Sequence, residues 1–84
     1  MYPNDEVANL NAANSAMQRG DYATAERYLI KAGNNSEVTY AKGVLAAQQG
    51  DYAAAAQHFS QAENSMPEAK EALQTIKEIM QYTE

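Results

Sequence analysis

The side chains best suited to acid–base or nucleophilic chemistry lie in one short stretch that holds Asp51, His58 and Ser60. A histidine between a carboxylate and a hydroxyl is the arrangement of a hydrolytic triad. On one helix, however, seven residues separate Asp51 from His58, which places them about 10 Å apart, beyond hydrogen-bond reach. His58 also takes the place that Tyr28 holds thirty residues earlier. We therefore interpret it as a packing or surface residue.

No metal site and no phosphate-binding loop is predicted either. His58 has no second histidine or carboxylate three or four residues away on its helix face, and the chain has no cysteine. The four glycines are isolated from one another, unlike those of a phosphate loop. We expect a chain that is not an enzyme and that needs no metal or cofactor.

The amino-acid composition argues against two classes of partner, nucleic acids and membranes. The 84 residues, of which 45% are hydrophobic, suit one folded domain. Eleven acidic residues against six scattered Lys and Arg give a net charge of −5, so there is no basic patch for nucleic acid or anionic lipid. The longest uncharged apolar stretches, such as residues 43–47, are far shorter than the ~20 residues of a membrane-spanning helix. Neither nucleic-acid binding nor membrane insertion is expected.

Two compartments fit this sequence. The lack of cysteine agrees equally with cytoplasm and periplasm. Residues 1–6 are acidic and lack the basic and apolar regions of a signal peptide. The chain is therefore expected to be cytoplasmic, or to be a piece of a longer exported protein.

An internal repeat with a period of thirty residues organises the chain. Residues 18–25 recur as residues 48–55 with six of the eight positions identical, and the same offset pairs Leu29 with Phe59 and Ala32 with Ala62. A repeat of this length indicates stacked supersecondary units. Each unit is predicted to be a helical hairpin. The glycine of the Gly-Asp pair ends one helix in the left-handed conformation, and the aspartate caps the next helix.

Five helices are predicted from the caps and the apolar spacing. The first runs from near Pro3 and Asn4 to Arg19, the second covers about residues 22–32, and the third, capped by Asn35 or Ser36, extends to Gln49. The fourth covers residues 52–63, and the fifth, opened by a Ser-x-x-Glu capping box at residues 65–68, extends to about Tyr82. The residues expected to face inward are Val7, Leu10, Ala13 and Met17 in the first helix, Ala25, Tyr28, Leu29 and Ala32 in the second, Ala55, Ala56, Phe59 and Ala62 in the fourth, and Ala69, Ala72, Leu73, Ile76, Ile79 and Met80 in the fifth.

These residues resemble the signature of the tetratricopeptide repeat. The matching positions are Ala13, Gly20, Asp21, Tyr22, Ala25, Leu29 and Ala32 in the first copy and Gly43, Gly50, Asp51, Tyr52, Ala55, Phe59, Ala62 and Pro67 in the second. Two departures are Asn9 and Thr39 where the signature has tryptophan, and Ala12 and Lys42 where it has leucine. The resemblance implies an all-α single domain over residues 1–84, a five-helix right-handed solenoid fragment. It would comprise one hairpin at about 4–33, a second at about 36–64 and a capping helix at about 66–82.

A narrower resemblance covers residues 2–5, 9–14 and 25–29, which look like the carboxy-terminal repeat segment of OmpA-like outer-membrane proteins of Bacteroidetes. It implies that the chain is part of a longer cell-envelope protein and lies in the periplasm.

In tetratricopeptide folds the first helix of each hairpin lines a concave groove that binds peptides. The resemblance implies that the groove residues here are Leu10, Asn14, Met17 and Gln18 in the first copy and Tyr40, Val44, Ala47 and Gln48 in the second. This mixture of apolar and amide side chains suits an apolar or neutral peptide. The carboxylate clamp of some members is not expected, because only Asn14 matches it. The competing interpretation is that Leu10, Met17, Tyr40 and Val44 belong to the core.

Three functions fit these features. The first is a non-catalytic module that binds a protein or peptide, on a separate partner or on a neighbouring domain of its own chain. The second is a structural or self-associating spacer that ends a longer envelope protein, since two hairpins are fewer than a stack usually needs. The third, glycan binding, has the weakest support, because the chain has tyrosine but no tryptophan.

Overall fold

The computed structural model describes residues 6–82 and shows five α-helices, with no strand among these residues. The helices are α1 (Glu6–Gln18), α2 (Tyr22–Ala32), α3 (Ser36–Gln48), α4 (Tyr52–Ala62) and α5 (Pro67–Tyr82). The all-helical class is confirmed, and the helix ends that lie within these residues agree with the sequence to within one or two positions. The predicted start near Pro3 and Asn4 lies outside the described residues.

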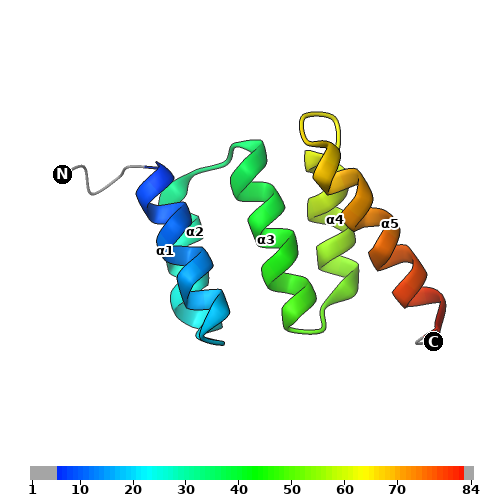
Figure 1. The fold of residues 1–84 in the computed structure, drawn as a ribbon, viewed down its shortest axis with the longest axis horizontal. Helices are drawn as coiled ribbons and strands as arrows, with labels where there is room; N and C mark the ends of the chain where they lie inside the picture. The colour runs from blue at the N-terminus through cyan, green and yellow to red at the C-terminus, as the bar shows by residue number, and fades with distance from the viewer. Residues whose placement is uncertain (1–5, 83–84) are drawn as a thin grey trace.

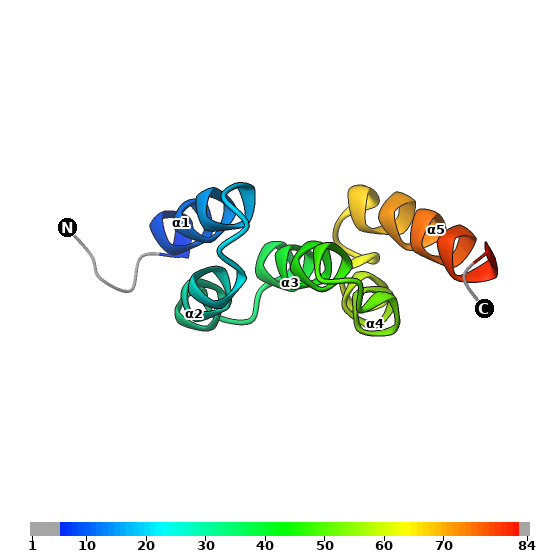
Figure 2. The same ribbon diagram turned by 90° about the horizontal axis from the view of Figure 1, so that it is seen from below.

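Consecutive helices run in opposite directions, so α1, α3 and α5 begin at the same edge of the molecule (Figure 1). Viewed along the helices, α2 and α4 form one side, while α1 and α5 rise on either side of α3 on the other (Figure 2). The molecule is elongated, with principal extents of 45 × 27 × 14 Å. The face that carries α1, α3 and α5 is therefore concave, with α3 at its floor.

The turn between α1 and α2 forms as the Gly-Asp pair predicts. Gly20 has a φ of 76°, and its N–H donates to the Met17 carbonyl at 3.0 Å while the Asp21 N–H donates to the Ala16 carbonyl at 2.9 Å. These two bonds are the glycine-terminated helix end in which the last carbonyls are satisfied from beyond the helix. The Asp21 carboxylate then accepts the Thr24 N–H at 3.3 Å, which caps α2.

The turn between α3 and α4 repeats this geometry thirty residues later. Gly50 has a φ of 82°, and the N–H groups of Gly50 and Asp51 donate to the carbonyls of Ala47 and Ala46 at 3.0 and 2.9 Å. Asp51 accepts the Ala54 N–H at 3.2 Å. Both aspartates are thus helix caps, as expected from the sequence.

Two other helix starts were predicted less accurately. Of the two candidates for the cap of α3, it is the Asn35 side chain that accepts a backbone N–H, from Val38 at 2.8 Å. α5 begins at Pro67, so Met66 rather than Ser65 precedes it, one residue later than the capping box requires. The reason is the proline, which has no N–H to donate and suits the first helical position.

Two small cores share α3. The first joins α1, α2 and α3 through Ala13, Ala16, Met17, Ala25, Leu29, Ala32, Val38, Ala41 and Leu45. The second joins α3, α4 and α5 through Ala46, Ala55, Phe59, Ala62, Ala69, Leu73 and Ile76. Because α5 packs on α4 as α3 packs on α2, the fifth helix closes the second core.

Glycine at position 43 permits a close contact between α3 and the Phe59 ring of α4. A Cβ at Gly43 would lie 2.6 Å from Cε1 and 2.8 Å from Cδ1 of Phe59. The first hairpin has Ala13 and Leu29 at the equivalent positions, both buried. The larger aromatic ring of the second copy is therefore accommodated by the loss of one methyl group from the facing helix.

The prediction that Val7 faces the core is wrong, since Val7 is 65% exposed. α1 instead buries Asn9, Ala13, Ala16 and Met17. At 3.6 residues per turn these four residues share one face of α1, and Val7 falls on the opposite face. Tyr28 and Ala56 were also expected inside and are half-buried.

Within residues 6–82, no helix is both long enough and apolar enough to span a bilayer.

Candidate functional site

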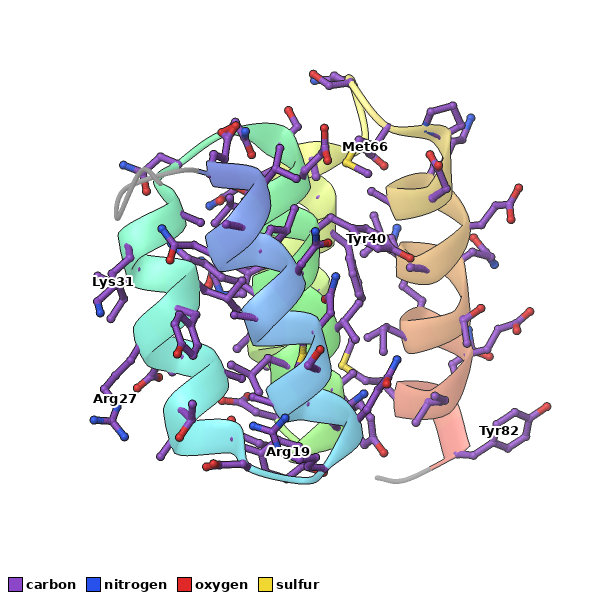
Figure 3. All side chains as sticks on the ribbon, turned by 60° about the vertical axis from the view of Figure 1, so that its left-hand side comes forward. Arg19, Arg27, Lys31, Tyr40, Met66 and Tyr82 are labelled. Carbon is purple, nitrogen blue, oxygen red and sulfur yellow. The ribbon has the colours of Figure 1, made fainter. Side chains whose placement is uncertain are left out.

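The concave face carries two neighbouring hollows. The first, of about 190 Å³, lies between α1 and α3 and is closed at one end by Met66 of the α4–α5 connection. Its walls are Leu10, Asn14, Glu37, Tyr40, Ala41 and Val44. Figure 3 shows Tyr40 and Met66 between α1 and α5. This hollow is an apolar pocket with one amide and one carboxylate at its rim.

The second hollow, of about 460 Å³, lies between α3 and α5. It is lined by Val44, Ala47, Gln48, Tyr52, Phe59, Ala72, Thr75, Ile76 and Ile79. No ionisable group other than the Tyr52 phenol lines it. Val44 lines both hollows, so they lie side by side along α3, and we call the two together the groove.

The structure brings six of the eight predicted groove residues to these hollows. Leu10, Asn14 and Tyr40 line the first, Ala47 and Gln48 line the second, and Val44 lines both. Met17 does not reach the groove, because it is only 6% exposed and belongs to the first core. Gln18 is exposed and lines neither hollow. For Met17 the core interpretation holds.

Leu10, Tyr40 and Val44 serve the fold and the groove together. All three are half-buried and pack against the core clusters. The Tyr40 ring meets the Phe59 ring with centroids 5.4 Å apart and planes tilted by 49°. Tilted aromatic pairs at this separation are attractive. Replacing Tyr40 by alanine would therefore disturb packing as well as the groove.

The contribution of α5 to the groove was not predicted from the sequence. Ala72, Thr75 and Ile79 form the wall opposite α1, yet their spacing also fits a helix that merely covers a core. The sequence did contain a signal for this wall, because two of its residues follow predicted groove residues at the same interval. Thr75 stands 31 residues after Val44, and Ile79 stands 31 residues after Gln48. The groove therefore spans three helices.

The convex side holds the candidate chemical residues. His58, Asp51 and Lys42 line a hollow of about 280 Å³ together with Glu26 of α2. Burial lowers the pKa of His58, and the nearby positive charge of Lys42 lowers it further, while Asp51 opposes the shift. No hydrogen bond joins His58 to Asp51 among the described residues, where the Asp51 carboxylate accepts the Ala54 N–H. This geometry does not assemble a triad.

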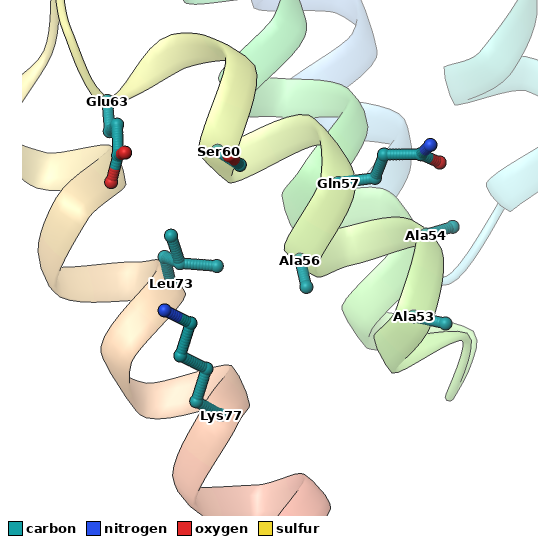
Figure 4. A pocket seen from close by; sticks show the side chains of 8 residues that line it. All are labelled: Ala53, Ala54, Ala56, Gln57, Ser60, Glu63, Leu73 and Lys77. Carbon is teal, nitrogen blue, oxygen red and sulfur yellow. The ribbon is translucent and has the colours of Figure 1, made fainter.

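Another hollow, of about 660 Å³, lies between α4 and α5 on the same convex side (Figure 4). Apart from Gln57, its lining from α4 consists of the short side chains of Ala53, Ala54, Ala56 and Ser60, and Lys77 of α5 lies across from them. Such a surface offers few large apolar side chains to hold a ligand. We therefore place the candidate site in the smaller concave hollows, where aromatic and aliphatic side chains converge.

No group of three or more His, Asp or Glu side chains suited to a metal ion occurs within residues 6–82. Neither a protein-family model, nor a curated protein, nor a solved structure matches this chain.

Proposed function

We propose that this chain is a non-catalytic protein-interaction module that binds a peptide segment of a protein along the concave groove. The observation that carries the proposal is the pair of neighbouring hollows that share Val44. Peptide sites of this kind take apolar anchor side chains into pockets between helices. The convex hollows instead mix alanine and a few aliphatic side chains, such as Ile30, with the charged side chains of Glu26, Lys42, Asp51, Glu63 and Lys77.

The repeat architecture supports the same proposal. Two hairpins with matching Gly-Asp turns, followed by a lone helix that covers the second core, are what a right-handed tetratricopeptide-like solenoid would provide. Such folds stack their hairpins to build an extended concave surface. The groove residues then come from the first helix of each hairpin and from α5.

The proposal is tested by affinity capture of a partner with the full chain as bait. Val44→Arg is the variant that is expected to disrupt binding in the groove. Val44 is half-buried and lies at the junction of both hollows, so an arginine there places a charge and a long side chain in the groove. The matched control is Ser60→Arg, because Ser60 is exposed on the convex side of α4. Circular dichroism and urea unfolding establish that both variants fold.

A partner retained by the unaltered chain and by Ser60→Arg, and lost with Val44→Arg, supports the groove. Its contact segment is then mapped by cross-linking to residues of α3 and α5. A partner that both folded variants retain equally shows that binding does not use the groove and contradicts the proposal.

A further inference from the structure

A carboxylate stands in the first turn of each helix that builds the groove. These are Glu6 in α1, Glu37 in α3 and Glu68 in α5, which recur at intervals of 31 residues. The two helices of the convex layer, α2 and α4, have no acidic residue in the first turn, and the carboxylates at their starts are the caps Asp21 and Asp51, at the opposite edge of the molecule. Within the described residues, the first-turn glutamates therefore belong to the three groove helices.

These carboxylates share one edge of the concave face, because α1, α3 and α5 all begin there (Figure 1). Glu37 is itself part of the wall of the first hollow. The Glu6 carboxylate accepts a hydrogen bond from Asn35 Nδ2, which ties the start of α1 to the start of α3. The apolar groove is thus bordered along one side by negative charge.

The positively charged side chains do not line the groove. No lysine or arginine lines either concave hollow, whereas Lys42 and Lys77 line the convex hollows. Arg27 and Lys31 project outward from α2, on the side away from α5 (Figure 3). The lining of the groove therefore offers a ligand apolar side chains and the Glu37 carboxylate but no cation, with Glu6 and Glu68 at the same edge of the molecule.

We propose that the groove selects a basic, apolar peptide segment: apolar side chains enter the two hollows while lysine or arginine residues face the row of Glu6, Glu37 and Glu68. The inference rests on the proposed function and specifies its ligand. Complementary charge at the rim of an apolar site favours the correct partner and repels acidic ones. Carboxylates in a first turn also favour a helix electrostatically, so the test must separate ligand selection from helix stability.

The probes are three labelled peptides of about ten residues, which in extended form span roughly 33 Å, less than the 45 Å length of the molecule. The three peptides have leucine and phenylalanine at the same positions. They differ only in the residues between these positions, which are lysine in one peptide, glutamine in the second and glutamate in the third. Binding to the full chain is measured by fluorescence polarisation. We expect affinity to fall in the order lysine, glutamine, glutamate, and the differences to shrink as ionic strength rises from about 0.1 M to about 0.5 M.

The charge variant is Glu37→Gln with Glu68→Gln, and its matched control is Glu26→Gln with Glu63→Gln, which removes the same charge from the convex side. The first pair should weaken binding of the lysine peptide by about three- to tenfold and leave the glutamine peptide unchanged. The control should change both affinities by less than about twofold. Urea unfolding of each variant reports the separate effect on helix stability.

The outcomes distinguish this inference from the proposed function. Tighter binding of the glutamine or glutamate peptide, or equal losses in the charge variant and its control, would overturn the charge preference. If the three peptides bind equally weakly while Val44→Arg still releases a partner, the groove function stands and this inference fails. Peptide binding that Val44→Arg leaves intact contradicts both.

Discussion

The contact between Gly43 and Phe59 makes the sharpest prediction for stability. Adding one methyl group, Gly43→Ala, places a carbon 2.6 Å from the ring, whereas carbon atoms in favourable contact lie about 3.5–4.0 Å apart. Forcing a well-packed core apart in this way costs about 1–3 kcal/mol. The same change gains about 1 kcal/mol of helix propensity, because Gly43 lies inside α3 with an ordinary helical φ. We expect a net loss of up to about 2 kcal/mol.

The first hairpin supplies the matched rescue. Because Ala13 faces Leu29 there, the double variant Gly43→Ala with Phe59→Leu reproduces a pair that the chain already packs. Phe59→Leu alone should cost roughly 1–2 kcal/mol through lost volume. The double variant should be more stable than the sum of the single changes by at least about 1 kcal/mol, the coupling expected for residues in contact.

Urea unfolding followed by circular dichroism at four points of the cycle measures this coupling, and an unchanged denaturant slope shows that the comparison is valid. The control is the reverse double-mutant cycle in the first hairpin, with Ala13→Gly, Leu29→Phe and both changes together. We expect the phenylalanine ring to be tolerated there only when Ala13 is also replaced by glycine. If Gly43→Ala stabilises the chain and its effect adds to that of Phe59→Leu without coupling, then the Phe59 ring moves aside at no cost and the packing does not require glycine at position 43.

Three further predictions concern the turns and His58. Asp51→Ala should cost about 1 kcal/mol in urea unfolding, because it removes the carboxylate that caps α4, whereas Asp51→Asn should retain most of the stability. Gly50→Ala should cost about 1 kcal/mol through its positive φ alone, because a Cβ there meets nothing within 4 Å; a loss as large as several kcal/mol would contradict this. His58→Gln should reduce the loss of stability between about pH 8 and pH 5. The pKa of His58 is lowered in the folded chain by burial and by Lys42, so the unfolded chain takes up protons more readily as pH falls, and the stability present above about pH 6.5 is lost. Equal urea midpoint shifts in the unaltered and variant chains would show that His58 does not contribute.

Local signals in the sequence were sufficient for the helices and turns. A glycine with positive φ and an aspartate cap act within a few residues, so the turns at Gly20 and Gly50 follow directly from the amino acids present. The apolar stripe of α5 was equally readable, and Ala69, Leu73 and Ile76 are buried as expected.

Only the tertiary structure decided which apolar residues fill the core and which line the groove. Val7 and Met17 are both apolar and lie on the same helix, yet one is exposed and the other buried. The difference arises from which face of α1 packs against α2 and α3. The placement of α5 as the second wall of the groove likewise depends on how it packs on α4. Periodicity along one helix carries no information about such contacts between helices.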